Sequence, residues 1–394
     1  MGTRWIPWGS VLMRILHVVT YISSDGAFGG PVRVARSQAA ELARRGHQVT
    51  VVSAAPPAET TDIMVDGYRL RTFPGALISQ RFGFAGMRSA ALNRFLQAEI
   101  GRSDLVHIHL ARDLITLPAA LAAKRASVPY VLQPHGMVDA SDRLLAGPVD
   151  LVATRPALRH AAMVLALTSE EATDLKSVCA AAQVHQIKNG LSRGEAVDAV
   201  SGSPSDTKSM AGRVLFLARL HSRKRPVAFV QMATLLHARG RDYEYIIAGP
   251  DEGEGETVAL AISRSPARIR WIGPVDPNGT DELMKSAEVY VLPSVGEVFP
   301  MSILEAFRAR TPVVATTSLG IAEKCAEYRA AALTDGSPQE LADAVDLIIQ
   351  DSNHRDELRA GAQAYFEAEL GIEAVVDELV EHYSRAVTAE PNRS

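Results

Sequence analysis

The sequence has little cysteine and no long apolar run. Among its 394 residues only Cys179 and Cys325 are cysteines, and they lie far apart. This spacing excludes a disulfide framework and a clustered-thiol metal site, and it is compatible with a reducing cytoplasm. No apolar run approaches the roughly 20 residues that span a bilayer, so we expect a protein that is not integral to a membrane.

A large charge of one sign is absent as well. The 41 lysines and arginines against 45 aspartates and glutamates give a formal net charge of -4, which argues against a nucleic-acid partner. The composition, 47% hydrophobic and 22% charged, is that of a soluble globular protein, and the length predicts two domains. Residues 1–12 lack the apolar core of a signal peptide and are expected to form an N-terminal arm.

Short apolar or β-branched runs alternate with helical stretches in both halves of the chain. The expected strands span 15–20, 48–53, 105–109, 130–133, 163–167 and 184–187 in the first half, and 214–218, 245–248, 269–272, 289–292 and 312–315 in the second. Such alternation predicts an α/β fold with parallel sheets covered by helices on both faces. The expected limits are 13–190 for the first domain, 191–212 for a polar linker and 213–368 for the second domain.

Two glutamates, Glu297 and Glu305, flank seven residues directly after the expected strand 289–292. A carboxylate accepts two hydrogen bonds from a vicinal diol, so two carboxylates beside an anion site would suit a sugar nucleotide. For an isolated pair, the alternative is that both glutamates solvate a helix end, because exposed Glu is the usual case.

The residues between the two glutamates predict a loop followed by a helix that starts at Pro300. Proline is favoured at a first helical position because its missing N–H would be unpaired there in any case. The amides of Met301, Ser302 and Ile303 would then point forward without partners. A helix N-terminus of this kind attracts phosphate, so we expect an anion site at the start of this helix.

Arg219 and Lys224 follow the expected strand 214–218. Open α/β sheets bind ligands at the carboxyl ends of their strands. A guanidinium fork and a mobile ammonium can together neutralise a diphosphate that gains charge as it leaves. A solvated basic turn is the alternative interpretation of these two residues taken alone.

Glycines follow several of the other expected strands. Gly249 and Gly273 come after 245–248 and 269–272, and the loop 26–31, which includes Gly29 and Gly30, follows the first strand. Glycine lets a backbone come within hydrogen-bonding distance of a ligand, although a plain turn is the competing explanation. The spacing G-x-G-x-x-G, which is the fingerprint of dinucleotide-binding domains, is absent. The main sequence evidence for a nicotinamide-dependent dehydrogenase is therefore lacking.

Histidines occur at two strand ends of the first half. His135 follows the strand 130–133, in the order Gln-Pro-His-Gly-Met, and a single histidine at such a place is more often structural. His107 and His109 share one face of the strand 105–109. No third ligand is identifiable in the sequence, so packing in a core or cleft is expected for this pair in place of a metal site.

Taken in order, the glycine-rich loop, the His-Gly pair at His135, the Arg…Lys pair and the Glu-x7-Glu segment resemble the retaining GT-B glycosyltransferases. The resemblance is to family 4 (glycosyl transferases group 1) and extends over nearly the whole chain. It implies two Rossmann-like domains facing a central cleft, with a terminal helix, within 369–394, that crosses back onto the first domain. The chain departs from the family at Arg225 and Val298, where glycine is common.

The resemblance also implies roles for individual residues. Glu305 would hold the ribose diol, Glu297 a sugar hydroxyl, Arg219 and Lys224 the diphosphate, and His135 would lie near the transferred sugar. The implied catalytic residues are His135, Arg219, Lys224 and Glu297, and the implied donor-binding residues are Gly29, Gly30, Gly249, Gly273, Pro274, Val275, Phe299, Pro300, Met301, Ser302 and Glu305. No residue is implied as a metal ligand.

The implied activity is retaining, metal-independent hexosyl transfer from a UDP-sugar or GDP-sugar to a hydroxyl acceptor, by a cytoplasmic enzyme with no permanently bound cofactor. The expected pathway is the assembly of surface polysaccharide or glycolipid, so the acceptor would be a saccharide or lipid-linked. A transferase that tailors a small-molecule metabolite is one alternative. A nucleotide-sugar epimerase of the same fold is the alternative from a different class.

Aromatic and basic residues interleave in 79–88 and again in 92–96. Such a segment could rest peripherally on an anionic surface at the inner membrane face and meet a lipid-linked acceptor. It could equally form an ordinary helix with Phe side chains inward and Arg side chains toward water. The sequence alone leaves both interpretations open.

Overall fold

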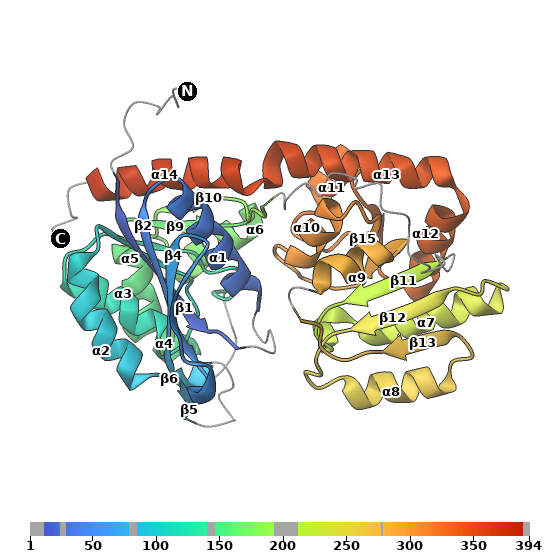
Figure 1. The fold of residues 1–394 in the computed structure, drawn as a ribbon, viewed down its shortest axis with the longest axis horizontal. Helices are drawn as coiled ribbons and strands as arrows, with labels where there is room; N and C mark the ends of the chain where they lie inside the picture. The colour runs from blue at the N-terminus through green and yellow to red at the C-terminus, as the bar shows by residue number, and fades with distance from the viewer. Residues whose placement is uncertain are drawn as a thin grey trace. The chain divides into compact units, whose positions relative to one another are not determined.

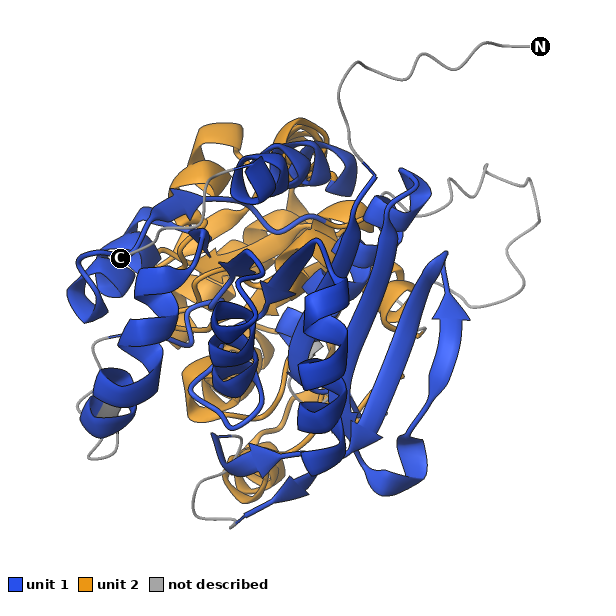
Figure 2. Ribbon diagram, turned by 90° about the vertical axis from the view of Figure 1, so that its left-hand side faces the viewer, with its two compact units in different colours: residues 1–23, 28–190, 372–394 blue, residues 24–27, 191–371 orange. Residues whose placement is uncertain are grey.

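The computed structural model of the protein describes residues 12–23, 29–78, 85–139, 146–192, 212–276 and 279–388. These residues form two compact units (Figure 2). Unit 1 contains the described residues up to Gly190 together with the C-terminal helix from Ile372, and unit 2 contains the described residues of Leu191–Gly371.

Unit 1 is built on an eight-stranded sheet in the order β10-β9-β8-β7-β1-β2-β4-β3. Its strands are β1 (Arg14–Tyr21), β2 (Gln48–Ala55), β3 (Asp62–Val65), β4 (Tyr68–Pro74), β7 (Leu105–Ile108), β8 (Tyr130–Leu132), β9 (Met163–Ala166) and β10 (Val184–Gln186). The pairings are parallel except that edge strand β3 runs antiparallel to β4. A separate antiparallel pair joins β5 (Ala76–Leu77) to β6 (Met87–Arg88).

Helices cover both faces of this sheet, with α1 (Gly29–Arg44) on one face and α2 (Ala90–Glu99) and α3 (Thr116–Arg125) on the other (Figure 1). The remaining helices before unit 2 are α4 (Ala146–Val149), α5 (Arg155–His160) and α6 (Ser169–Val178), the 3-10 helices η1 (Pro57–Glu59) and η3 (Ile100–Arg102), and the π-helix η4 (Asp150–Thr154). Val18, Ile108 and Leu132 of the central strands are fully buried. Near-continuous apolar strands are what a parallel sheet covered on both faces requires.

The C-terminal helix α14 (Ile372–Thr388) packs against α1, β7 and β8 of unit 1. Val376, Leu379 and Tyr383 are fully buried, and their spacing of three and four residues places them on one helix face. The guanidinium of Arg45, just after α1, lies 2.6 Å from the carboxylate of Asp377 on α14. These contacts make α14 part of the core of unit 1.

The segment with interleaved aromatic and basic residues is described only in part, because residues 79–84 lie outside the described ranges. On α2, Leu92 and Leu96 are buried in the core of unit 1. Phe95 packs against Phe73 with ring centroids 5.1 Å apart, and the Arg71 guanidinium lies 4.7 Å from the Phe95 ring. The described part therefore packs as an ordinary amphipathic helix. Within the described ranges, no helix is long and apolar enough to cross a membrane.

Unit 2 is built on a six-stranded, wholly parallel sheet in the order β13-β12-β11-β14-β15-β16. Its strands are β11 (Arg213–Leu217), β12 (Glu244–Ala248), β13 (Arg268–Trp271), β14 (Val289–Leu292), β15 (Val313–Thr316) and β16 (Ala332–Thr334). Its helices are η5 (Ser222–Lys224), α7 (Pro226–Ala238), α8 (Gly255–Arg264), α9 (Thr280–Ser286), α10 (Met301–Arg308), α11 (Ala322–Tyr328), α12 (Pro338–Gln350), α13 (Ser352–Tyr365) and η6 (Phe366–Leu370). α7 packs with α8 and α12, whereas α10 packs with α9 and α13.

The α/β fold class with two parallel-sheet domains, expected from the sequence, is confirmed. Every expected strand is present, with ends that differ by at most two residues. The expectation of purely parallel sheets is wrong at one edge, because β3 folds back on β4 through a tight turn at Asp66 and Gly67, both with positive φ. The sequence interpretation missed β3 and β4 of the unit 1 sheet, β16 of the unit 2 sheet and the short pair β5 and β6.

Candidate active site

The carboxyl ends of β11 and β14 mark the switch point of the unit 2 sheet. β11 pairs in parallel with β14 on one side and with β12 on the other, and the chain passes from β11 outward to β13 before it returns to β14. In open α/β sheets, ligands bind outside the carboxyl ends of the strands at such a point. The loops after β11 and β14 are therefore the best-placed segments of unit 2 for a ligand.

Lys224 and Glu297 meet across this switch point. The Lys224 ammonium lies 2.7 Å from the Glu297 carboxylate, and the two side chains are only 16% and 15% exposed. The backbone holds the two loops together, because the Val295 N–H donates to the Arg223 carbonyl at 2.9 Å and the Arg223 guanidinium donates to the Gly296 carbonyl. The structure thus joins two residues that the sequence separates by more than seventy positions.

The ammonium of Lys224 has a perturbed pKa. Burial lowers the pKa of Lys224 below its ordinary value, the Glu297 carboxylate opposes this, and the positive charges of Arg219 and Arg223 lower the pKa further. Three cationic side chains therefore act on one another, and the Glu297 carboxylate is the one paired with Lys224. Such a cluster would gain from a bound anion, because the anion's charge would offset the repulsion among the cations.

Arg219 is held by a residue that the sequence interpretation missed. Its Nη1 donates to both carboxylate oxygens of Glu252, at 2.6 and 2.7 Å. Glu252 lies after β12, the neighbour of β11, so the pairing depends on strand order and could not be found in the sequence. The Arg219 side chain remains 37% exposed, so its guanidinium is still accessible to a ligand.

The start of α10 differs from the expectation by one residue. Pro300 is the N-cap, with an extended backbone, and the helix begins at Met301. As a result the Ile303 N–H donates to the Pro300 carbonyl at 3.1 Å, so it is not one of the amides that point forward. The expected anion site at this helix start is reduced to the amides of Met301 and Ser302.

The other predicted residues of this segment are placed as follows. The Ser302 hydroxyl accepts a hydrogen bond from the Tyr290 hydroxyl at 2.7 Å. Phe299 is partly exposed in the loop before α10. Glu305 lies on the second turn of α10 and is only 5% exposed, so only a small part of its carboxylate surface is open to a ribose.

The two glycines after β12 and β13 serve different purposes. Gly249 has φ +146, and a Cβ at this position would lie 2.0 Å from the Ala218 carbonyl oxygen, so close backbone packing requires glycine there. Its N–H donates to the Gly273 carbonyl at 2.8 Å. Gly273 has φ +75 with open space around it, and Pro274 and Val275 after it are exposed and partly exposed. Gly249 therefore has a structural explanation, whereas the Gly273 turn is open to a ligand.

Arg225 adopts the backbone conformation that glycine favours. It ends η5 in the left-handed region, with φ 52 and ψ 49. A side chain in this region costs roughly 1–2 kcal/mol relative to a right-handed one. The family that the chain resembles commonly has glycine at this position. Arg225 replaces that glycine but keeps the left-handed backbone conformation that glycine favours.

In unit 1, His135 lies on a tight turn after β8. His135 and Gly136 both have positive φ, 55 and 73. The buried carboxylate of Glu171, another residue missed in the sequence, accepts the N–H of Gly136 at 2.5 Å and that of Leu167 at 2.6 Å, which holds this turn. Desolvation lowers the pKa of His135 to about 3, although part of the residue remains exposed. The histidine is therefore neutral at physiological pH.

Behind His135 lies a cluster of histidines that corrects the sequence interpretation. The expectation that His107 and His109 lack a third partner is wrong, because His17 on β1 lies opposite His107 on β7. Ring nitrogens of the three histidines lie within 4.8 Å of one another, and all three side chains are buried. His17 escaped notice because only the register of the parallel strands brings it to the pair.

The glycine-rich loop of unit 1 lies partly outside the described residues, which resume at Gly29, the first residue of α1. Gly30 is exposed, and a Cβ there would meet nothing within 4 Å. The described part of this loop therefore shows an open helix start without a steric need for glycine at position 30.

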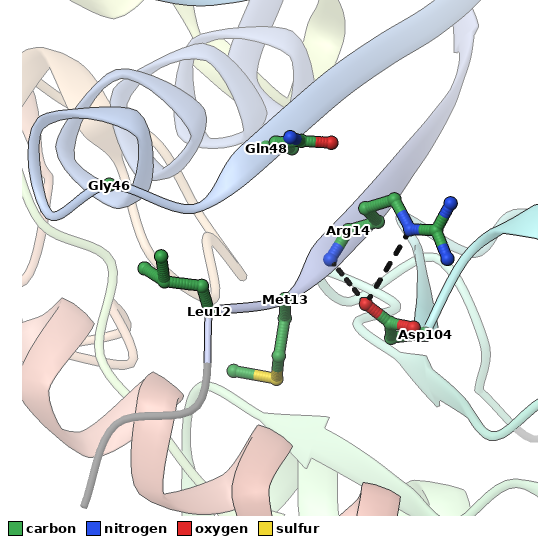
Figure 3. A pocket seen from close by; sticks show the side chains of 6 residues that line it. All are labelled: Leu12, Met13, Arg14, Gly46, Gln48 and Asp104. Carbon is green, nitrogen blue, oxygen red and sulfur yellow. Dashed lines mark hydrogen bonds and ion pairs between the residues drawn. The ribbon is translucent and has the colours of Figure 1, made fainter.

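A hollow of about 410 Å³ opens at the amino ends of β1 and β2 (Figure 3). Its lining consists of Leu12, Met13, Arg14, Gly46, Gln48 and Asp104. The Arg14 N–H donates to the Asp104 carboxylate at 2.7 Å, so the two polar groups satisfy each other. Because ligands of α/β sheets bind at the carboxyl ends of the strands, we do not regard this hollow as the active site.

Two family models match the chain in succession. The glycosyl transferase 4-like domain matches residues 29–190, and glycosyl transferases group 1 matches residues 204–365. D-inositol 3-phosphate glycosyltransferase of Jonesia denitrificans is 27% identical and is matched over 74% of this chain and 74% of its own length. 2-Deoxystreptamine glucosyltransferase of Streptomyces kanamyceticus is 27% identical over 73% of this chain and 79% of its own.

A solved structure shares the fold of the whole chain. The crystal structure of HepE from Anabaena in complex with UDP and glucose has a TM-score of 0.72, is 20% identical, and is matched over 94% of this chain and 99% of its own. The two parallel-sheet domains and this likeness show that the chain has the GT-B fold. Within that fold class, the chain belongs to the group 1, family 4-type glycosyltransferases, and it is a glycosyltransferase enzyme.

Proposed function

We propose that the chain transfers a hexosyl group from a nucleoside diphosphate sugar to a hydroxyl acceptor with retention of anomeric configuration. The observation that carries this proposal is the group of Lys224, Glu297 and Arg219 at the switch point of unit 2. It combines cations for a diphosphate with a carboxylate for a sugar hydroxyl. The UDP and glucose bound by Anabaena HepE support a nucleotide-sugar donor, and both UDP-sugars and GDP-sugars are candidates.

In the proposed step, the bond between the anomeric carbon and the diphosphate oxygen breaks, and negative charge builds up on the leaving group. Arg219, Lys224 and the amides of Met301 and Ser302 would stabilise that charge more than they stabilise the bound donor, which is the condition for catalysis. Because fixed cations neutralise the diphosphate in this scheme, we propose that the transfer needs no metal ion.

Glu297 is proposed as a positioning group for the sugar and not as a nucleophile. Its carboxylate is already paired with Lys224 at 2.7 Å. A double-displacement hydrolase needs two carboxyl groups about 5 Å apart, one as nucleophile and one as acid. In the proposed retaining course, a phosphate oxygen takes the acceptor proton on the face that the leaving group vacates, so no covalent intermediate on the protein forms. Glu305 would bind the ribose diol, and His135 would contact the sugar.

Two classes of acceptor are proposed. A saccharide or lipid-linked acceptor would place the enzyme in surface polysaccharide or glycolipid assembly. A small cyclitol or aminocyclitol is the second candidate, because the names of two relatives refer to inositol 3-phosphate and 2-deoxystreptamine.

For a lipid-linked acceptor, the proposal includes peripheral contact with an anionic membrane at the cytoplasmic face. Leu77 and Ile78, which are 45% and 51% exposed, offer apolar surface directly before the interleaved segment 79–88, and its last residue, Arg88, is exposed. Pelleting with vesicles of anionic phospholipid at low salt tests this contact. If the protein stays in the supernatant, the membrane part of the proposal is wrong.

The transfer itself is tested by incubation with UDP-hexoses and GDP-hexoses, with and without a cyclitol phosphate, an aminocyclitol and a lipid-linked saccharide. Release of nucleoside diphosphate that requires an acceptor is the expected result, whereas an epimerase would change the sugar without releasing it. Proton NMR of the product reports whether the anomeric configuration is retained. Turnover should persist in EDTA. Unchanged turnover in both Lys224→Ala and Glu297→Ala would contradict the proposed site.

A further inference from the structure

Three buried histidines of unit 1 converge from two neighbouring strands. His17 of β1 is the register partner of His107 of β7, and His109 follows two residues later on the same face. The three side chains are 0%, 0% and 1% exposed. One ring nitrogen from each lies within 4.8 Å of the others. The result is a compact set of three nitrogen donors in the buried interior of unit 1.

We infer that His17, His107 and His109 form a binding site for a single divalent transition-metal ion of the Zn²⁺ type. The inference stands independently of the proposed function, because none of the residues assigned to the donor is a ligand. Neutral imidazoles favour zinc, copper or nickel over magnesium and calcium, which prefer oxygen ligands. The ion would tie β1 to β7 inside the core of unit 1.

The spacing of the ring nitrogens fits this assignment. His17 Nδ1 and His109 Nε2 face each other at 3.2 Å. Ligands at 2.0–2.1 Å from a tetrahedral zinc ion are about 3.3 Å apart, so this pair already has the required separation. The third donor is His107, whose ring is stacked on that of His109 with centroids 4.5 Å apart. The His107 ring would have to turn out of this stack to direct a nitrogen at the same ion.

One nitrogen of the cluster lacks a hydrogen-bond partner. His107 Nε2 is buried, and no hydrogen bond of normal geometry reaches it from the described residues. The Gln133 side chain lies near this ring but makes no hydrogen bond of normal geometry to it. Buried polar atoms in native proteins almost always have a partner. A metal ion at the centre of the cluster would supply one.

The outer ring nitrogens also face suitable groups. His107 Nδ1 lies 2.5 Å and His17 Nε2 lies 3.5 Å from the Tyr383 hydroxyl oxygen. His109 Nδ1 lies 2.8 Å from His135 Nε2. Metal-binding histidines usually donate their other ring N–H to an acceptor, which fixes the tautomer. Tyr383 and His135 can accept these N–H groups, so the second layer of contacts that a metal site needs is present.

Metal binding is tested on the full chain, expressed without a polyhistidine tag and refolded from denaturant in the presence of Zn²⁺ or Co²⁺, because the site is buried. Elemental analysis after gel filtration should give one equivalent of metal per chain. The Co²⁺ form should show the strong visible absorption of a four-coordinate site. X-ray absorption of the Zn²⁺ form should show at least three imidazole nitrogens at about 2.0–2.1 Å. This last measurement needs no variant.

Substitution of a metal ligand should abolish metal binding. His17→Gln and His107→Gln should each lower bound metal from one equivalent to none. The matched control is His382→Gln, a buried histidine on α14 outside the cluster, which should keep one equivalent. The inference is wrong if the wild-type chain retains no metal, if His17→Gln binds as well as wild type, or if fewer than three imidazoles coordinate the ion.

Discussion

The ion pair between Lys224 and Glu297 has two proposed roles, one in stability and one in catalysis, and a double-mutant cycle separates them. The perturbations are Lys224→Met, Glu297→Gln and the two changes together. Each single change leaves one charged group, about 15% exposed, without its partner at 2.7 Å. The double change removes both charges from the partly buried site. We therefore expect the double variant to be more stable than either single variant, although it should be no more active.

The magnitude follows from the geometry. Two unit charges 2.7 Å apart attract by about 6 kcal/mol at an effective relative permittivity near 20, and the loss of hydration offsets most of this. We expect each single variant to lose about 1–3 kcal/mol of unfolding free energy, because a poorly hydrated charge is left unpaired. The double variant should lie within about 1 kcal/mol of wild type, so the coupling energy should be close to the sum of the two single losses, about 2–6 kcal/mol.

Catalysis should not follow the same pattern. Loss of a charge that stabilises the transition state typically costs about 10²–10³ in kcat, and both singles should show a loss of this order. The double variant should be no better than the worse single, because each group acts on a different part of the donor. Unfolding free energies from urea titration and turnover from nucleoside diphosphate release provide the two readouts. If activity in the double variant recovers together with stability, the pair is structural and the assigned roles are wrong.

Three further predictions follow from unit 2. In Glu252→Gln, the side chain that competes with the ligand for Arg219 loses its charge. Calorimetry should therefore show UDP or GDP binding about two- to fivefold tighter, which is the range of one exposed ion pair. Weaker binding would show that Glu252 positions the guanidinium. Arg225→Gly should raise the free energy of unfolding by about 0.5 kcal/mol. The substitution relieves the strain of a side chain in the left-handed region, and this gain exceeds the cost of the greater conformational entropy that glycine gives the unfolded chain. A lower melting temperature of the variant would contradict this. Because burial lowers the pKa of Lys224, kcat/KM should fall as pH rises through a midpoint below that of an ordinary lysine.

The sign of the Lys224 prediction differs between activity and stability. The folded protein releases this proton at lower pH than the unfolded chain, so the unfolded chain binds more protons across that window. Unfolding free energy should therefore rise with pH there, while activity is lost with the ammonium. Lys224→Arg, if active, should move the alkaline limb of the activity profile to higher pH, since arginine stays charged. An unchanged limb in that variant would assign it to another group.

Local patterns in the sequence were sufficient for most strands of the two sheets, all except β3, β4 and β16. Apolar runs such as 289–292 and 105–109 became β14 and β7 with nearly the same ends, because a strand buried on both faces must be apolar throughout. The strand β4 carried a readable signal that was overlooked, namely the alternation of buried Tyr68, Leu70 and Thr72 with more exposed residues. The three-residue strand β16 carried none, since Ala-Leu-Thr is too short to show a period.

The contacts that define the candidate sites depended on tertiary structure. Glu252 reaches Arg219 because β12 is the neighbour of β11, and His17 reaches His107 because β1 and β7 pair in one particular register. The helix begins one residue later than expected, after Pro300, and the hydrogen bond from the Ile303 N–H to the Pro300 carbonyl removes one expected amide.

By itself, the sequence determined that the chain is an α/β protein of two parallel-sheet domains and which charged residues follow β11 and β14, because helix and strand periodicity and the order of residues at strand ends are local properties. Only the tertiary structure decided that Lys224 pairs with Glu297, that Glu252 occupies Arg219, and that a third histidine completes a buried cluster. The physical reason is that strand order and register are set by packing across the whole sheet, and no local pattern encodes which distant strands become neighbours.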